Sequence, residues 1–546
     1  MPGPARSIHV NLVDIDARAV TPTTLTVAGG RIAKLEPCGG EPDVFAIPGF
    51  VDAHVHVESS MLTPANFAAE AVRHGTVATV SDPHEIANVL GLAGVEFMLR
   101  SAAAVPFKFC FGAPSCVPAT AFETAGAELR VDDVTRLLDD PRIGYLSEVM
   151  NFPGVLAGDA DLRAMIEAAR RRGKPVDGHA PGLRGDDARR YFAAGITTDH
   201  ECFTLDEAED KLAAGAKILI REGSAARNYA ALFPLVDRHP GRVMFCSDDL
   251  HPDAFRQGHI DRLCRRAVAD GADVFNVLRA ACLTPAEHYG LPVGRLRVGD
   301  SADFVCVDNL ERFGVVATYL DGVEVSAGGR SRIMASAEDP VNCFVCSPKS
   351  SGDFGVPAVA GKRLRVIEAE DGQLVTGSSW IEPTVEAGCA VADVSRDLMK
   401  LTVVNRYEQF STPAVAFVRG FGLRRGAIAG SVGHDSHNIV AVGADDASLA
   451  AAVNAVVAEQ GGLAAVDGGR VETLPLPVAG LMSLRPCAEV ASRYEALDET
   501  AKTLGSPLAA PYMTLSFMAL LVIPSLKLSD RGLFDGVAFA PTDLWG

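Results

Sequence analysis

Between residues 50 and 246 the chain repeats one pattern, in which a short apolar run is followed by a polar loop and an amphipathic segment. In one such unit Asp161 can cap a helix, Gly173 can end it, and an apolar strand then begins at Pro175. Strands that alternate with helices are typical of a parallel sheet. The pattern predicts eight strands, at 50–55, 76–80, 107–111, 143–147, 175–178, 196–199, 217–220 and 243–246.

Eight strands alternating with helices favour an α/β fold with a (β/α)8 TIM-like barrel, which we expect to span 48–294. An open doubly wound sheet is the competing topology, but no Gly-x-Gly-x-x-Gly follows a strand to support nucleotide binding. The flanks 1–47 and 295–340 both contain short strands and tight turns, and we expect them to form one small β-sandwich domain. Residues 346–546 are long enough for their own core and predict an additional C-terminal α/β domain.

Composition narrows the class of partner. The formal net charge of -19 argues against a nucleic-acid partner, because such proteins usually need a basic surface, and it favours a small-molecule substrate. The sequence contains no apolar segment that would serve as a signal peptide or as a membrane span of ~18 residues, so no membrane partner is expected. The 12 cysteines are scattered, which suits reduced thiols in a cytoplasmic protein.

Ligand-type side chains follow most of the predicted strands. In a (β/α)8 barrel the carboxyl ends of the strands face one pocket, so polar groups there are interpreted first as functional. A single buried histidine or glutamate is usually a satisfied core residue, but six strands that each deliver such a residue at the same end are hard to obtain by accident. The candidates are His54, His56, Asp82, His84, Glu85, Glu148, His179, Asp199, His200, Glu201, Asp248 and Asp249.

The natural assembly among these candidates is four imidazoles and two carboxylates. Borderline divalent metals accept nitrogen and oxygen ligands together, and a carboxylate can bridge two of them. The set is larger than one catalytic metal needs, which favours a two-metal site that holds hydroxide at neutral pH. An ionised carboxylate beside it can take the proton on attack and return it to a leaving group; we assign this to Asp248. The set comprises His54, His56, His179, His200, Glu148 and Asp248.

Three other motifs carry less weight. Cys343 and Cys346 form the one Cys-x-x-Cys, which we interpret as incidental because a structural zinc site needs a second pair. His56-Val57-Glu58 matches half of the zinc deaminase signature, but the cysteine pair lies far downstream after an asparagine rather than a proline, so we reject that fold. The cluster 433–438 (GHDSHN) offers ligands for a second metal, although a turn stabilised by its Asp, Ser and Asn side chains is favoured.

The run 48–61, PGFVDAHVHVESSM, resembles the amidohydrolase superfamily and, more narrowly, the bacterial adenine deaminases. His-x-His alone specifies only the superfamily, whereas the Asp-Pro-His-Glu run and the C-terminal blocks carry the narrower resemblance. It covers nearly the whole chain. The other similar blocks are 81–86, 148–155, 177–182, 198–201, 247–249, 418–423, 433–438, 474–483 and 524–534.

This resemblance implies hydrolytic deamination of adenine to hypoxanthine and ammonia by a metal-bridging hydroxide, a reaction of purine salvage. It implies two divalent ions, preferably Mn²⁺ or Fe²⁺, and a preparation loaded with Zn²⁺ would not contradict the ligand set. Many relatives bridge their metals with a carboxylated lysine, but no lysine lies near Glu148, so a hydantoin or dihydroorotate hydrolase loses weight. The implied ligands are His54, His56 and Asp248 for one ion and His179 and His200 for the other, with Glu148 bridging.

Glu85 is the candidate for proton transfer to the purine ring, and Asp82 and His84 would orient it or shape the pocket. A purely structural Asp82 that caps a helix after Pro83 is the alternative. Two other functions stay open, namely a related hydrolase of another cyclic amidine or amide, and a non-catalytic metal- or purine-binding protein. We expect a homo-oligomer, with a dimer favoured, in which the C-terminal domain covers the barrel mouth or builds a subunit interface.

Overall fold

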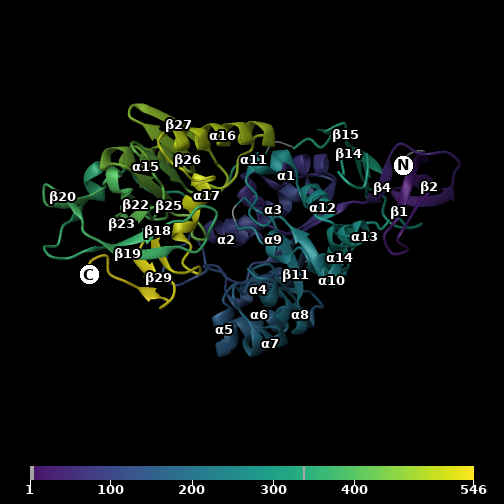
Figure 1. Ribbon diagram of the computed structural model, residues 1–546, viewed down its shortest axis with the longest axis horizontal. Helices are drawn as coiled ribbons and strands as arrows, with labels where there is room; N and C mark the ends of the chain where they lie inside the picture. The colour runs from purple at the N-terminus through teal and green to yellow at the C-terminus, as the bar shows by residue number, and fades with distance from the viewer. Residues whose placement is uncertain (1–4, 225, 336–337) are drawn as a thin grey trace.

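The computed structural model describes residues 5–224, 226–335 and 338–546. Residues 1–4, 336 and 337, which the sequence assigns to the small β domain, lie outside the described residues. Figure 1 shows three parts along the long axis of the molecule. The N-terminal strands lie at one end, a barrel of strands and helices lies in the centre, and the C-terminal region, in green and yellow, lies at the other end.

The central part is a closed parallel barrel. Strands β5 to β9 form one ladder and β10 to β12 another. The two ladders meet at both edges, because the amide of Thr197 donates to the carbonyl of Val176 at 2.8 Å and Val55 pairs with Asp248 in parallel. The predicted (β/α)8 barrel is therefore confirmed. Its strands are β5 Phe50–Val55, β6 Thr76–Ser81, β7 Lys108–Ala113, β8 Ile143–Val149, β9 Val176–Gly178, β10 Thr198–Asp199, β11 Lys217–Arg221 and β12 Val243–Cys246.

Helices between these strands cover the outside of the barrel and bury apolar faces against it. The helix that leads into β9 begins at Ala160, two positions earlier than a cap at Asp161 would give, because the side chain of Asp159 accepts the amides of Asp161 and Leu162. The expectation that Asp161 is the cap is thus wrong, since an aspartate two positions upstream reaches the free amides first. The main helices are α1 Pro64–Ala71, α2 His84–Leu90, α3 Leu92–Ala103, α4 Val131–Asp139, α6 Ala160–Arg171, α7 Gly185–Ala193, α8 Leu205–Ala213, α11 Pro252–Gln257, α12 Ile260–Ala269 and α14 Thr284–Tyr289.

Both flanks of the barrel contribute to one small β sheet. Strand β4 joins them, because it pairs in parallel with β1 and antiparallel with β13. The sheet folds over, so that Val10, Leu25, Phe304 and Tyr319 from its two halves share one core. Among the described residues its order is β16-β15-β14-β13-β4-β1-β2-β3. Its strands are β1 Arg6–Asp14, β2 Ala19–Ala28, β3 Arg31–Pro37, β4 Phe45–Pro48, β13 Phe304–Val307, β14 Val315–Leu320, β15 Val323–Ala327 and β16 Arg330–Ser331.

The C-terminal region contains a second large sheet with helices on it. Helix α15 covers one side of this sheet and starts where the side chain of Asp445 accepts the amide of Ser448. In the described part of the chain the strand order is β19-β18-β23-β22-β25-β24-β26-β27. The elements are β18 Leu364–Glu368, β19 Gly377–Ile381, β22 Met399–Val404, β23 Ala414–Arg419, β24 Ala427–Gly430, β25 Ile439–Gly443, α15 Asp446–Ala458, β26 Gly462–Asp467, β27 Arg470–Pro475, α16 Cys487–Thr503, α17 Pro511–Ser516, β28 Leu526–Ser529 and β29 Gly532–Asp535.

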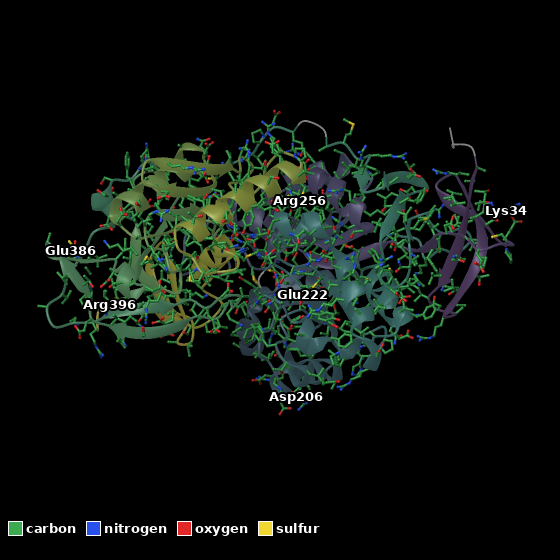
Figure 2. All side chains as sticks on the ribbon, turned by 45° about the horizontal axis from the view of Figure 1, so that its top comes forward. Lys34, Asp206, Glu222, Arg256, Glu386 and Arg396 are labelled. Atoms are coloured by element: carbon green, nitrogen blue, oxygen red, sulfur yellow. The ribbon has the colours of Figure 1, made fainter. Side chains whose placement is uncertain are left out.

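The C-terminal region lies against the barrel at the carboxyl ends of its strands. The amide of Ser483 donates to the carbonyl of Met61 at 2.8 Å. Helix α16 packs on α11, where Arg256, labelled in Figure 2, pairs with Glu495 at 2.6 Å. One large apolar core runs through both parts, so this contact is a packed interior rather than a loose surface. Among the helices of the described residues, we find none with the length and apolar character that crossing a membrane requires.

Candidate active site

Two imidazoles stand at the end of β5. Side chains alternate along a strand, so His54 and His56 lie on the same side and reach the same space. Their Nε2 atoms are 3.3 Å apart, and both side chains are buried. The ring of His54 also stacks on that of His200, with 4.2 Å between the ring centres. The structure therefore brings together imidazoles from β5 and from the end of β10.

Glu148, near the end of β8, lies between two pairs of histidines. Its Oε1 is 3.4 Å from Nε2 of His56 and 3.9 Å from Nε2 of His54. Its Oε2 is 2.7 Å from Nδ1 of His179 and 3.2 Å from Nε2 of His200. Each oxygen of one carboxylate thus faces one pair, which is the arrangement that a bridging ligand requires.

Asp248 completes the first of these groups. It follows β12 in the left-handed conformation, with φ at 53°, and the amide of Asp248 donates to the carbonyl of His54 at 2.9 Å. This contact turns Oδ1 toward the histidines, 3.2 Å from Nε2 of His56 and 3.6 Å from Nε2 of His54. Its Oδ2 accepts a hydrogen bond from Arg221 at 2.5 Å.

These residues fit a divalent metal. One group of ligand atoms lying within 4.8 Å of one another comes from His54, His56 and Asp248, and another from His54, Glu148 and His200. The two Nε2 atoms, 3.3 Å apart and buried, have the separation of two nitrogens that ligate one cation at about 2 Å. The site is electron-rich, buried and of mixed nitrogen and oxygen composition, which suits borderline metals.

The charge state of the carboxylates agrees with this role. Burial alone would raise the pKa of Glu148, but the adjacent His179 and His200 lower it well below its usual range. Burial would also raise the pKa of Asp248, and the Arg221 guanidinium and His56 lower it well below its usual range. Both groups are therefore anions at neutral pH, as metal ligands must be.

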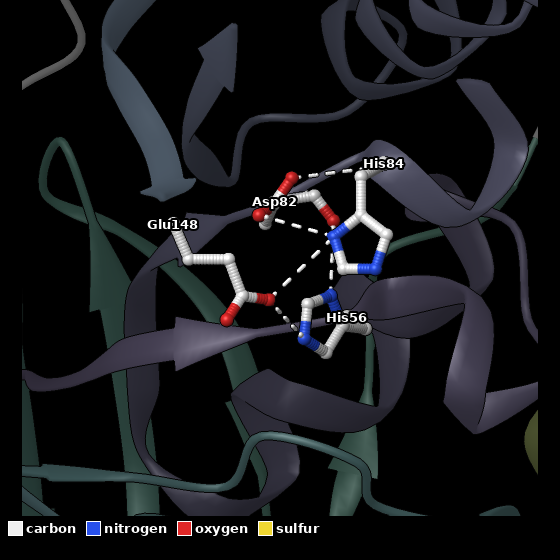
Figure 3. Close-up of side chains that lie close together, drawn as sticks. All are labelled: His56, Asp82, His84 and Glu148. Carbon is white, nitrogen blue, oxygen red and sulfur yellow. Dashed lines mark hydrogen bonds and ion pairs between the residues drawn. The ribbon is translucent and has the colours of Figure 1, made fainter. Parts of the chain in front are cut away.

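Asp82 and His84 lie beside this cluster, after the end of β6 (Figure 3). Nδ1 of His84 is 3.2 Å from Oδ2 of Asp82 and 3.6 Å from Oε1 of Glu148. The other oxygen of Asp82 accepts the amide of His84 at 3.0 Å, at the start of α2. Asp82 thus stabilises the first turn of the helix and also faces His84. One side chain can therefore serve both the structural role and the pocket-shaping role that we considered from the sequence.

Glu85 faces both His84 of the barrel, whose Nε2 is 3.6 Å from its Oε1, and the C-terminal region. Its Oε1 lies 2.6 Å from Nδ1 of His434, and its Oε2 accepts a very short hydrogen bond from Nε2 of His437. Asp435, between them in the sequence, approaches Nε2 of His84 at 3.9 Å. The turn favoured for 433–438 is present, with Asn438 donating to Ser436 at 3.2 Å, and it also presents its histidines to the barrel mouth. The two histidines of its Gly-His-Asp-Ser-His block were the feature of the sequence that could have indicated this contact.

Sequence reasoning also missed the residues behind the ligands. Arg221 on β11 is buried and holds Glu201 through two contacts, one of them at 2.9 Å, while it also holds Asp248. On the opposite side, Asp52 accepts hydrogen bonds from the amide of Ser247 at 3.0 Å and from the ring of His259 at 2.7 Å. Asp52 lies within the run 48–61 but was given no role, and Arg221 ends an apolar strand without a motif, so only the fold reveals these partners.

Two adjoining cavities lie at this end of the barrel, and one of them reaches the cluster. A cavity of about 40 Å³ adjoins the histidines, and its outer wall comes from the C-terminal region. A larger apolar cavity of about 1260 Å³ lies next to it. Met150, Val522 and Ile523 line both, so they form the partition between the two spaces. The apolar side chains of the outer wall are Leu374, Phe517, Leu520, Val522 and Ile523.

Comparison with known proteins agrees with this architecture. The adenine deaminase C-terminal domain model matches residues 373–540, and the amidohydrolase family model matches residues 45–325. Proteins named adenine deaminase from Salinibacter ruber, Sulfurovum sp. and Methanosarcina mazei are 59%, 53% and 48% identical to this chain. The alignments cover 98%, 97% and 98% of this chain and 98% of each relative. The chain therefore belongs to the amidohydrolase family and, within it, to the adenine deaminase family.

Proposed function

We propose that this protein hydrolyses adenine to hypoxanthine and ammonia. One observation carries the proposal: the cluster of imidazoles and carboxylates at the barrel mouth occurs in a chain that is 59% identical, over nearly its full length, to a protein named adenine deaminase. The apolar outer wall that faces the cluster suits an uncharged base better than a charged substrate.

For the metal centre we propose two divalent cations. His54, His56 and Asp248 would hold one of them, His179 and His200 the other, and Glu148 would bridge them. The support is the pair of carboxylate oxygens of Glu148, each of which faces one pair of histidines. We propose Mn²⁺ or Fe²⁺ for this centre because of the resemblance to adenine deaminases, and Zn²⁺ also suits nitrogen and carboxylate ligands.

The chemistry then divides between the cations and the protein. When bound, the cations supply a water acidified enough to serve as the nucleophile at neutral pH. Oδ1 of Asp248 faces the ligand cluster while Arg221 fixes its other oxygen, so this carboxylate can take the proton of the water and return it to the departing amino group. The products, hypoxanthine and ammonia, balance adenine plus one water.

Proton transfer to the ring is assigned to Glu85, with His84 and Asp82 beside it. Both His84 and Glu85 line the small cavity, where the attacked carbon of the base must lie. Addition of water at this carbon develops charge on the neighbouring ring nitrogen. The ionised Glu85 would take one proton of the water and pass it to this nitrogen, while Asp248 would pass the other to the amino group. Asp82 acts through His84, because its carboxylate contacts that ring at 3.2 Å.

An ammonia-release assay on enzyme reconstituted with manganese or iron under reducing conditions tests this function. We expect release from adenine and none from guanine, cytosine or adenosine. Release from a different cyclic amidine or amide instead would identify a related hydrolase. Fewer than one metal ion per chain together with no turnover of any base would identify a non-catalytic binding protein. Light scattering on the same preparation measures the oligomeric state, for which a homodimer stays our prediction.

A further inference from the structure

Glu85 stands where the barrel meets the C-terminal region. It lies in the first turn of α2, which in Figure 1 is at the side of the barrel that faces α17 and β25. Its side chain is buried, and each carboxylate oxygen contacts an imidazole from the C-terminal region. One of these, His437, lies 352 positions later in the chain. A carboxylate of the barrel is thus held by two side chains from another part of the protein.

The direction of one of these hydrogen bonds is fixed by the protein itself. The amide of Gly433 donates to Nδ1 of His437 at 3.3 Å. This nitrogen is therefore the acceptor, and the proton of the neutral ring must be on Nε2, where it points to Glu85. His437 is a donor to Glu85, and Glu85 accepts it as an ionised carboxylate.

Both imidazoles are themselves held rigidly. The ring of His434 stacks on Phe517 with 4.8 Å between centres and 17° between planes, and its amide donates to the carbonyl of Ser516 at 3.1 Å. His437 has a left-handed backbone, with φ at 54°, and its amide donates to the carbonyl of Gly433 at 2.7 Å. The two donors therefore have fixed positions in the loop between β24 and β25.

The contacts are hydrogen bonds rather than the remains of another metal site. Ligand atoms about 2 Å from a common cation are about 3 Å from each other. Nδ1 of His434 and Oε1 of Glu85 are separated by 2.6 Å, and the contact with His437 is shorter still. Both separations are those of hydrogen bonds, so the two imidazoles hold the carboxylate in place; the ligand-type group that Glu85 forms with His84 and Asp435 includes neither imidazole.

We infer that His434 and His437 are positioning residues that fix the carboxylate of Glu85 for proton transfer, so that the C-terminal region completes the active site. This inference rests on the proposed function, in which Glu85 exchanges a proton with the base. A general acid or base contributes about 10²–10⁴ in rate, and a misplacement of about 1 Å can remove 10² of it. Loss of one imidazole donor should therefore lower kcat by about 10–100-fold.

The experiment compares His437→Ala with His437→Gln, whose amide can still donate to Glu85. For each variant we would measure kcat and KM with adenine, metal content by mass spectrometry and the Kd of hypoxanthine by calorimetry. We expect His437→Ala to lower kcat by about 10–100-fold while KM, Kd and metal content stay within about twofold. His437→Gln should recover most of the loss, because it restores a donor.

A matched control variant and a double-mutant cycle between Glu85 and His437 separate a positioning role from an effect on stability. His288, on α14, contacts Thr197 and Lys217 at the other end of the barrel, and His288→Gln should leave kcat unchanged. In an enzyme that carries Glu85→Gln, the further change His437→Ala should lower kcat no more, because the group that it positions is gone. His434→Ala breaks the second bond independently, so the test does not depend on the folding of one variant.

Two results would overturn the inference. One is an unchanged kcat in both alanine variants; the other is a loss of kcat that glutamine does not restore and that metal content or Kd follows in parallel. Failure of the proposed function gives a different result, since the unaltered enzyme would then release no ammonia from adenine.

Discussion

Lys211 provides the sharpest test of what holds the barrel mouth together. It lies on α8 with no exposed surface, and its ammonium donates to the carbonyl of Ala180 at 2.7 Å and to Glu207 at 2.8 Å. Oδ2 of Asp199 is 3.2 Å away and also accepts the amide of Ala180 at 3.1 Å. The other oxygen of Asp199 accepts the amide of Glu201 at 2.7 Å. One buried cation thus links the loops that follow β9 and β10, which carry two of the proposed ligands.

The variant Lys211→Met removes this cation and leaves two buried carboxylates without it. Breaking a buried ion pair by removing one partner costs about 3–5 kcal/mol, because the remaining charge is desolvated and uncompensated. A domain of about 150–250 residues loses about 2–4 °C of Tm for each kcal/mol. We therefore expect the Tm of the barrel transition to fall by about 6–20 °C.

Differential scanning calorimetry at one fixed scan rate measures this change. The partly exposed pair of Lys502 and Asp498, with 40% and 16% of their side-chain surface accessible, provides the control, and Lys502→Met should move Tm by less than about 2 °C because solvent reaches the lysine and screens the pair. The triple variant Lys211→Met, Asp199→Asn, Glu207→Gln should recover much of the loss, since neutral replacement of a whole buried ion group is often tolerated. A fall no larger than that of the Lys502 control would refute the reasoning.

Three further predictions concern the centre and its surroundings. Glu148→Gln should abolish ammonia release while circular dichroism shows an intact fold, and full activity would exclude the bridging role. Asp52→Asn weakens the contacts with Ser247 and His259 that fix the end of β12, so metal affinity should fall about 10–100-fold in a chelator competition; an unchanged affinity would contradict this. Burial lowers the pKa of Lys527 from 10.5 to about 7. The unfolded chain therefore binds more protons between those pH values, and the free energy of unfolding rises with pH across this window, by up to about 5 kcal/mol. Lys527→Met should flatten that rise, measured as the free energy of unfolding from urea titrations at pH 7, 8 and 9. If this free energy changes with pH equally in the variant and the unaltered protein, the lysine is not responsible.

The barrel could be predicted from the sequence because its signals are local. Each strand is a short apolar run with a helix after it, and even β10, only two residues long, lies within the predicted run 196–199. The ligand-type residues were found for the same reason, since they occur directly after those runs. Helix starts are less certain, as the shift from Asp161 to Asp159 illustrates, because several acidic residues compete for the same free amides.

The partners that support the centre could not be predicted, because they depend on long-range contacts. Arg221 has the appearance of a charged end of an apolar strand, and only barrel closure brings it to Asp248. The side chains of His434 and His437 meet Glu85 only when the C-terminal sheet packs on the barrel. Polar side chains whose purpose is to hold other side chains have no fixed spacing from them in the sequence.

Strand β4 has a consequence for synthesis of the chain. It needs β13 as its antiparallel neighbour, and roughly 250 residues separate the two strands. At ribosomal rates of about 5–20 residues per second, β4 waits about 13–50 s before that neighbour emerges. During this interval one edge of the N-terminal strands has no partner, and open strand edges invite pairing with other chains. The nascent protein is therefore most exposed to misassembly while the catalytic barrel is still being made.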